Sequence, residues 1–353
     1  MATIKDVAAA AGVSFTTVSH VVNHSRPVSA EARARVEQAI RQLDYVPSAV
    51  ARSLKARSTA TIGLVVPNST NPYFAELAHG VEEACMRRGY CVFLCHSGDD
   101  PDKQQHYLRV LQEKRSDGLI VASAGDDTVL TPLLTGTRTP LVIVDRHLEG
   151  LNADLLQIDH EHGAYLATRH LLELGHRRLG CIAGPSSTAV SALRVNGFQR
   201  ALSQYGVTLA PQAIVASDFS GAGGHRAAQQ LFDTLAPSAI FVSNDMMAIG
   251  ALRAAAERGI RVPHACSIIG FDAIELGAFT YPALSTVGQP VRLLGASAAQ
   301  MLFERIAQPE LAPARQRIVA PALCVRESTA RWGPEARDSS RRSHFQTEKK
   351  NGD

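Results

Sequence analysis

Residues 4–23 read IKDVAAAAGVSFTTVSHVVN, and this stretch decides how the chain begins to fold. Its first apolar residues recur at positions i, i+3, i+4 and i+7, which is the spacing of one face of a short amphipathic helix. These residues are Ile4, Val7, Ala8 and Ala11. Gly12 follows, and glycine enters a left-handed turn without steric strain. The stretch therefore predicts a helix that ends in a tight turn at Gly12.

A second helix is expected directly after this turn, because Ser14 can cap it by accepting hydrogen bonds from free N–H groups. The residues expected in its core face are Val18, Val21 and Val22, and those expected on its outer face are Thr16, Thr17 and His20. Helix, glycine turn and helix form the pattern of a DNA-binding helix-turn-helix, whose second helix enters the major groove. An ordinary helical hairpin inside a protein core is the alternative interpretation.

Positive charge is concentrated in the same part of the chain. Residues 1–60 contain eight Lys and Arg residues against four Asp and Glu residues, a net charge of +4. The whole chain carries +3, so the remaining residues sum to −1. A small basic module is typical of a protein that binds a polyanion. A solvated charged face is the alternative, but it explains the neighbouring helix-turn-helix less well.

The next segments are predicted to complete this module and connect it to the rest of the chain. Ser29 is expected to cap a third helix that reaches about Asp44, which gives a helix-turn-helix domain over residues 1–45. Residues 46–60 contain PSAVARSLK and are interpreted as a hinge helix and linker. Isolated helices of this length are marginal in water. The hinge is therefore expected to become helical only with DNA and a second chain present.

From residue 61 onward, short apolar runs alternate with helical stretches. The runs read as buried strands over 61–67, 90–96, 117–123, 140–145, 179–184, 238–245 and 266–272. Such repeated units predict parallel sheets with helices on both faces. We expect two lobes within residues 61–330, with a break near His160, and a disordered tail over 331–353. Ligands of such sheets bind at the carboxyl ends of the strands.

Several function classes are disfavoured by the sequence. There is no apolar run of the ~20 residues that a membrane span needs and no secretory signal, so we expect a cytoplasmic protein without membrane contact. No nucleotide-binding or nucleophile-elbow motif is present, so neither an enzyme nor a cofactor is expected. The six cysteines are interpreted as buried, reduced thiols. His160 and His162 lack the other ligands of a metal site, so they are interpreted as surface or capping residues.

Taken together, these motifs resemble those of the lactose/galactose repressor (LacI/GalR) family of bacterial transcriptional regulators. The resemblance rests on the opening helix-turn-helix, the PSAVARSLK hinge and the alternating strands and helices, and it covers all but the tail. It implies an N-terminal all-α helix-turn-helix head followed by an α/β periplasmic-binding-protein-like two-lobed domain with parallel sheets. It also implies a homodimer that binds a near-palindromic operator. Within the family, the chain is most similar to ribose operon repressors.

The resemblance implies which residues of the head contact DNA. By position these are Thr16, Thr17, His20, Arg26, Leu54 and Lys55. The first three would contact base edges, and Arg26 would reach the operator from the following loop. Leu54 of the hinge would wedge into a central base step and bend the DNA. Phe15 replaces the small polar residue that is common there in close relatives, so the operator sequence is expected to differ.

The second part of the chain resembles ribose-type periplasmic binding proteins, and this implies a polar and aromatic effector site. Its residues would be Asn71, Tyr73, Phe74, Ser123, Asp145, Arg146, Arg194, Phe219, Asn244, Asp272 and Gln289. Carboxylates, amides and guanidinium groups bind sugar hydroxyls, while aromatic rings cover C–H faces. Ser123 stands where the sugar binder has an amide. Individually, the aromatic residues could instead be core residues, and Asp145, Asn244 and Asp272 could merely cap helices.

A small sugar, with ribose as first choice, is the effector that this resemblance implies. A purine is the alternative, because the head also resembles that of the purine repressor. That repressor has a tryptophan after the aspartate of the fourth-strand motif, where this chain has Arg146. A planar base would favour the aromatic residue, and a polyol would favour the charged one.

Overall fold

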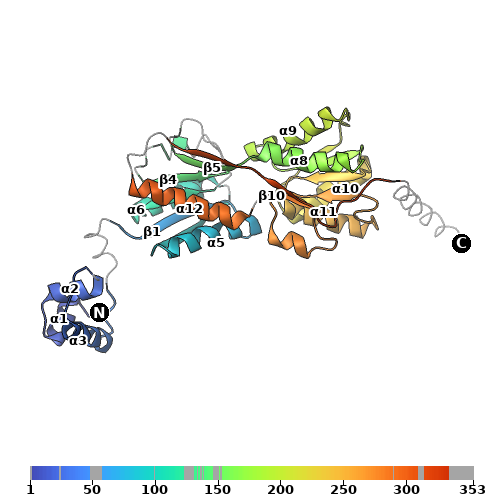
Figure 1. Cartoon of the computed structure of the whole chain (residues 1–353). Helices are drawn as coiled ribbons and strands as arrows, with labels where there is room; N and C mark the ends of the chain where they lie inside the picture. The colour runs from blue at the N-terminus through green and yellow to red at the C-terminus, as the bar shows by residue number, and fades with distance from the viewer. Residues whose placement is uncertain are drawn as a thin grey trace. The chain divides into compact units, whose positions relative to one another are not determined.

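The computed structural model describes residues 2–23, 25–47, 58–98, 100–122, 131–132, 134–135, 137, 139–145, 151, 153–288, 290–308 and 314–333. The chain divides into two compact units. The first is Met1–Ala60 with Arg115–Asp117, and the second is Thr61–Lys114 with Gly118–Asp353 (Figure 1). We describe each unit by itself.

The first unit contains a three-helix head made of α1 (Ile4–Ala11), α2 (Phe15–Asn23) and α3 (Ala30–Gln42). The side chains of Val7, Val18 and Val36, one from each helix, are fully buried against each other. The head is thus a compact core built from the apolar stripes that the sequence predicts.

The ends of these helices are fixed by local hydrogen bonds. Thr3 and Asp6 form a reciprocal capping box at the start of α1, and Gly12 closes it with a left-handed φ of 61°. Ser14 Oγ accepts the N–H of Thr17 at 3.1 Å, and Ser29 Oγ accepts that of Ala32 at 3.3 Å. The caps predicted at Ser14 and Ser29 are confirmed.

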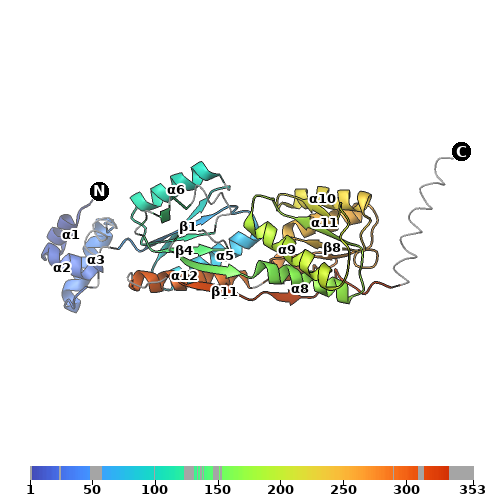
Figure 2. The ribbon, with the colours of Figure 1, turned by 90° about the horizontal axis from the view of Figure 1, so that it is seen from above.

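The first lobe of the second unit is a six-stranded parallel sheet in the order β11-β5-β4-β3-β1-β2. Its strands are β1 (Thr61–Val66), β2 (Cys91–His96), β3 (Gly118–Val121), β4 (Leu141–Val144), β5 (Asp154–Ile158) and β11 (Gln316–Val319). Helices α5 (Pro72–Met86) and α12 (Val291–Ala307) pack together on one face, and α6 (Pro101–Glu113) packs on the other (Figure 2). The sheet is therefore buried on both sides.

The second lobe has a four-stranded parallel sheet in the order β7-β6-β8-β9. Its strands are β6 (Leu179–Ala183), β7 (Ile214–Ala216), β8 (Ala239–Val242) and β9 (Ser267–Ile269). Helices α8 (His160–Glu173) and α9 (Ala189–Gln204) pack on one face, and α10 (Gly221–Thr234) and α11 (Asp245–Glu257) on the other. This lobe also contains the short helix η1 (Glu275–Phe279).

The chain passes between the two lobes three times (Figures 1 and 2). The first passage leads from β5 into α8, at the break expected near His160. The second leads from β10 (Thr286–Gly288) into α12, and the third from β11 into β12 (Ala322–Cys324), which pairs with β10. The prediction of a single break near His160 was therefore incomplete, because α12 and β11 return to the first lobe.

All seven predicted strands are present, and the prediction of parallel sheets is confirmed. The tail boundary at residue 331 is wrong, because Trp332 donates its N–H to Leu174 O at 2.8 Å and its ring lies against His176. The prediction of buried thiols holds for Cys85, Cys181 and Cys266 and is wrong for the exposed Cys91. No helix within the described ranges is long and apolar enough to cross a membrane.

Candidate effector site and DNA-binding face

Helix α2 presents the residues that the sequence predicts for reading bases. Thr16 is exposed, and Thr17 and His20 are partly exposed. The Thr17 hydroxyl lies 2.9 Å from Ser14 Oγ, and His20 Nδ1 lies 2.8 Å from Ser25 Oγ. A bond at one ring nitrogen fixes the orientation of the other. The face of α2 opposite the core is thus polar and locally ordered.

Two further residues of the head lie on its surface. Arg26 is exposed in the loop between α2 and α3, and Phe15 at the start of α2 exposes 61% of its surface. A large apolar ring is therefore exposed beside the polar face of α2. Leu54 and Lys55, predicted in the hinge, lie outside the described residues.

Five side chains from both lobes form a polar cluster, which we call the interlobe cluster; four of them are buried and Asp145 is 15% exposed. Its members are Tyr73, Asp145, His160, Arg194 and Asp272. Tyr73 and Asp145 come from the first lobe, where they lie in the first turn of α5 and directly after β4. His160 begins α8, Arg194 lies on α9, and Asp272 follows β9 of the second lobe. The sequence predicted four of the five members.

Asp145 is the centre of the first-lobe half of the cluster. Its carboxylate accepts a hydrogen bond from Tyr73 Oη and another from the N–H of Ile158 at 3.0 Å. Burial acts to raise the pKa of Asp145, but the contacts with His160, Tyr73 and Ile158 outweigh it and hold this pKa below its usual range. Asp145 is therefore an ionised carboxylate at neutral pH.

His160 connects the two halves. Its side chain is 3% exposed, so it is not a surface residue. The residue that caps α8 is Asp159, so His160 is not a helix cap either. Its Nδ1 lies 3.4 Å from Arg194 Nε and 3.3 Å from Arg194 Nη2, and its Nε2 lies 3.3 Å from Asp145 Oδ1. Burial lowers the pKa of His160, so the ring is neutral at pH 7. The interpretation of His160 as a surface or capping residue is wrong.

Arg194 uses all three of its nitrogens inside the protein. Nη1 donates to the carbonyl oxygen of Ser243, Nη2 donates to Asp272 Oδ1 at 3.1 Å, and Nε points to His160. The guanidinium carbon lies 3.9 Å from the centre of the Phe271 ring. Because an unpaired buried charge is strongly destabilising, these partners explain how Arg194 can be buried.

Asp272 is the second carboxyl group of the cluster. Its backbone has a φ of 112°, a conformation that L-residues rarely adopt. Burial raises its pKa to about 7, although the Arg194 guanidinium opposes this shift. Near neutral pH, Asp272 can therefore either donate or accept a hydrogen bond, which suits a ligand that presents both kinds of group.

The other predicted effector residues surround the cluster or support the backbone. Phe74 is partly buried with its ring 5.1 Å from that of Tyr73, and Phe219 packs so closely on Gly184 that a Cβ there would lie 2.1 Å from its ring. Asn71 Oδ1 caps α5 by accepting the N–H of Tyr73 at 3.1 Å. Asn244 caps α11 through Met247 and donates to Phe219 O at 3.0 Å.

Asn244 thus follows the helix-capping alternative, and Asn71 also caps a helix. The amide of Asn244 is 2% exposed and is used at both its oxygen and its nitrogen within the chain. Three further predicted residues, Ser123, Arg146 and Gln289, lie outside the described residues.

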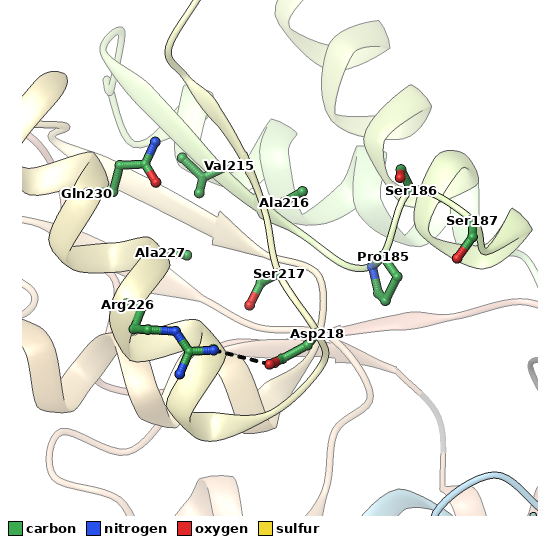
Figure 3. Close-up of a pocket in the computed structure, with 11 residues that line it drawn as sticks. Pro185, Ser186, Ser187, Val215, Ala216, Ser217, Asp218, Arg226, Ala227 and Gln230 are labelled. Carbon is green, nitrogen blue, oxygen red and sulfur yellow. Dashed lines mark hydrogen bonds and ion pairs between the residues drawn. The ribbon is translucent and has the colours of Figure 1, made fainter. Parts of the chain in front are cut away.

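A separate pocket of ≈ 630 Å³ lies on the second lobe, beyond the ends of β6 and β7 (Figure 3). The Arg226 guanidinium lies 3.3 Å from the Asp218 carboxylate beside it. None of the predicted effector residues lines this pocket, so it is distinct from the interlobe cluster. In the part of the chain that the structure describes, no group of His, Cys, Asp or Glu side chains is arranged to hold a metal ion.

Comparison with known proteins places this geometry in a family. Residues 3–48 match the model of bacterial regulatory proteins of the lacI family, and residues 168–329 match a periplasmic binding protein-like domain. The chain is 45% identical over 308 residues to the HTH-type transcriptional repressor PurR of Aliivibrio salmonicida, covering 87% of this chain and 92% of that protein. The chain belongs to the LacI family.

Solved structures agree with this assignment. A lac repressor dimer bound to operator superposes with a TM-score of 0.83, at 29% identity, over 93% of this chain and 99% of that one. A LacI-family regulator from Enterococcus faecium with bound ribose gives a TM-score of 0.70, at 30% identity, over 77% and 100%. The chain is therefore a DNA-binding transcriptional repressor of this family. The expected likeness to a ribose operon repressor is corrected by the comparisons, because several curated relatives that are 42–45% identical to this chain are PurR repressors.

Sequence reasoning missed His160 because it missed the strand before it. Residues 154–158 read DLLQI, which has a charged first residue and a glutamine near its end, so they do not stand out as an apolar run. Recognition of β5 would have identified His160 as a residue at the carboxyl end of a strand, where ligands bind in such sheets.

The raised pKa of Asp272 predicts a pH dependence of stability. The folded protein keeps a proton on Asp272 that the unfolded chain releases above its usual pKa of 3.8. The free energy of unfolding of the wild type should therefore fall relative to that of Asp272→Asn as pH rises from 3.8 to about 7. The slope should be on the order of 1 kcal/mol per pH unit, and the difference should be level above about pH 8.

Urea denaturation of the full chain at pH 5, 6, 7 and 8 measures this difference. Asp233→Asn is the matched control. Asp233 is exposed and its ion pair with Arg258 lowers its pKa, so its contribution to the free energy of unfolding changes only at lower pH. Parallel pH profiles for the wild type and Asp272→Asn would contradict the prediction.

Proposed function

We propose that this repressor binds a near-palindromic operator as a homodimer and is controlled by a small molecule held at the interlobe cluster, with a purine base as the first candidate. The observation that carries the proposal is the cluster itself. It brings two carboxyl groups, a guanidinium and a phenol together from both lobes, in a chain whose head has an exposed recognition-helix face.

A purine is supported by the relatives and by the chemistry of the cluster. Several curated relatives that are 42–45% identical to this chain are PurR repressors. A purine edge presents hydrogen-bond donors and acceptors together, which Arg194 and a carboxyl group at Asp272 can match. The rings of Phe74 and Phe219 would supply apolar faces for a planar base.

A sugar is the second candidate, and one observation favours it. A family member that is 30% identical to this chain was solved with bound ribose. Adjacent hydroxyls of a sugar pair well with an ionised carboxylate such as Asp145 and with the guanidinium of Arg194. The two candidates therefore compete for the same residues, and a direct binding measurement separates them.

Titration calorimetry of the full-length protein against hypoxanthine, guanine and ribose tests the effector. We expect one purine to bind, and Asp145→Asn to weaken its binding about tenfold or more by removing a charged acceptor. Bound effector should change operator affinity 5- to 150-fold, a coupling of ~1–3 kcal/mol. Asp218→Asn, in the separate pocket, is the matched control and should bind as the wild type does. Binding of ribose alone would make a sugar, not a purine, the effector. Effector binding that Asp145→Asn leaves unchanged would exclude the interlobe cluster as the effector site.

Operator recognition is proposed to use the outer face of α2. His20→Ala should weaken operator binding by roughly tenfold, since a base contact is worth ~1–3 kcal/mol, while effector binding persists. Gln38→Ala, at an exposed position of α3, is the matched control. Affinities are measured by gel shift or fluorescence anisotropy at 50 and 200 mM salt. The basic head should lose about tenfold or more affinity over this range, and a flat salt profile would contradict phosphate contact.

The homodimer is supported by a contrast between the two edges of the first-lobe sheet. Edge strand β11 carries Gln316 and Arg317, which is typical of an edge that faces solvent, and exposes one large apolar side chain, Ile318. Edge strand β2 reads CVFLCH, and its Phe93 and Leu94 are 43% and 50% exposed. An exposed apolar edge strand invites pairing or aggregation unless another surface covers it. A second copy is the proposed cover, since the superposed lac repressor structure is a dimer.

Substitution at the two edges tests this assembly. Leu94→Asp on β2 should shift the protein toward monomer and weaken operator binding, because two heads would no longer be held together. Ile318→Asp on β11 is the matched control, since Ile318 is 58% exposed on the opposite edge. Sedimentation velocity at micromolar protein measures the change. A Leu94→Asp variant that stays as dimeric as Ile318→Asp would move the proposed interface away from β2.

A further inference from the structure

His160 occupies a position that no other residue of the interlobe cluster shares. It is the first residue of α8, directly after the passage from β5. Asp145 belongs to the first lobe and Arg194 to the second. The His160 ring lies between the two, 3.3 Å from each of them. A movement of one lobe against the other would therefore change the contacts of this ring.

The polarity of the ring matches its two neighbours in only one protonation state. Arg194 has donors but no acceptor, so the nitrogen that it approaches, Nδ1, must be unprotonated. Asp145 is an acceptor, so the nitrogen that it approaches, Nε2, must carry the hydrogen. A neutral Nε2–H imidazole accepts from Arg194 at Nδ1 and faces Asp145 Oδ1 with its Nε2–H at 3.3 Å, an electrostatic contact without hydrogen-bond geometry. A charged imidazolium would place a second cation against Arg194, and the Nδ1–H tautomer would oppose both neighbours.

The surroundings of His160 restrict it to this arrangement. Its ring lies 5.8 Å from that of Phe271, and Arg194 stacks on the same Phe271 ring. Of the hydrogen-bond partners of Arg194, His160 is the acceptor that Nε uses, while Ser243 O and Asp272 occupy Nη1 and Nη2. Without His160, Arg194 would lose the contact that sets the direction of its Nε–H, and Asp145 would lose a polar neighbour.

We infer that His160 is a positioning residue of the effector site, which orients Arg194 by accepting its hydrogen bond at Nδ1 and holds the Asp145 carboxylate by the electrostatic contact of the facing Nε2 across the lobes. The inference rests on the proposed function for the identity of the site. It goes further in assigning the geometry of two ligand-binding groups to a third residue that need not touch the ligand.

Two substitutions separate polarity from size. His160→Gln keeps one acceptor and one donor on a side chain of similar length, whereas His160→Leu fills similar space with neither. We expect calorimetry with the purine or sugar that binds the wild type to give a dissociation constant within about threefold for His160→Gln and raised about tenfold or more for His160→Leu. The effector-induced change in operator affinity is measured for each variant against its own effector-free value.

A second buried histidine provides the matched control. His176 is 1% exposed and bonds to Ser238, Ser267 and the Ala330 carbonyl, away from the interlobe cluster. His176→Leu should lower the melting temperature and leave effector affinity unchanged. If His160→Leu binds effector as the wild type does, or if a folded His160→Gln binds as poorly as His160→Leu, the inference is overturned.

The ring itself can be observed without any effector. Nitrogen-15 spectra of histidine-labelled full-length protein, with the His160 signals assigned from their loss in His160→Gln, should show a neutral ring with hydrogen on Nε2 at pH 7. A charged ring or the Nδ1–H tautomer overturns the inference whatever the effector proves to be. If the ring is as expected but none of the three probes binds, the proposed effectors fail and the inferred geometry stands.

Discussion

The second unit depends on the burial of one guanidinium group. Arg194 is 5% exposed, and an uncompensated charge at such a position would cost several kcal/mol. Its partners come from three other segments, namely the start of α8, the end of β8 and the segment that follows β9. The charge therefore fixes the relative positions of these segments. A buried, already oriented guanidinium would also serve the proposed ligand site between the lobes as a strong donor.

From Arg194 the polar contacts continue into the first lobe through His160, Asp145 and Tyr73. The same lobes are joined covalently by three chain passages, one of which ends at His160. His160 thus belongs both to the interlobe cluster and to a chain passage between the lobes. A ligand that replaces any of the contacts between Arg194, His160 and Asp145 changes how strongly the lobes hold one another. This is the physical requirement for a small molecule to shift a two-state equilibrium, since it must bind the two states differently.

Much of the fold could be predicted from local chemistry. Gly12, Ser14 and Ser29 mark helix ends because φ and capping preferences depend on one or two residues. The longer apolar runs identify the central strands, which are buried on both faces. The strands that escaped prediction have three to five residues and lie at edges or passages, as β7, β10 and β12 do. Their strand character comes from pairing with distant segments, which short sequence windows do not contain. Trp332 was misassigned for the same reason, because its partners Leu174 and His176 lie far away in the chain.

The candidate site could likewise be predicted only where local sequence sets it, and not where distant partners do. Position after a strand identified Asp145 and Asp272, but it could not distinguish a ligand-facing amide from Asn244, whose oxygen and nitrogen are both used by the protein. It also could not give partners, so the pairing of Arg194 with His160 came only from the structure. Effector identity is harder still. The 45% identity to a PurR repressor is spread over 308 residues, whereas an effector contacts a handful of side chains. Relatives of one fold can therefore differ in ligand through one or two substitutions, so overall similarity alone does not identify the effector.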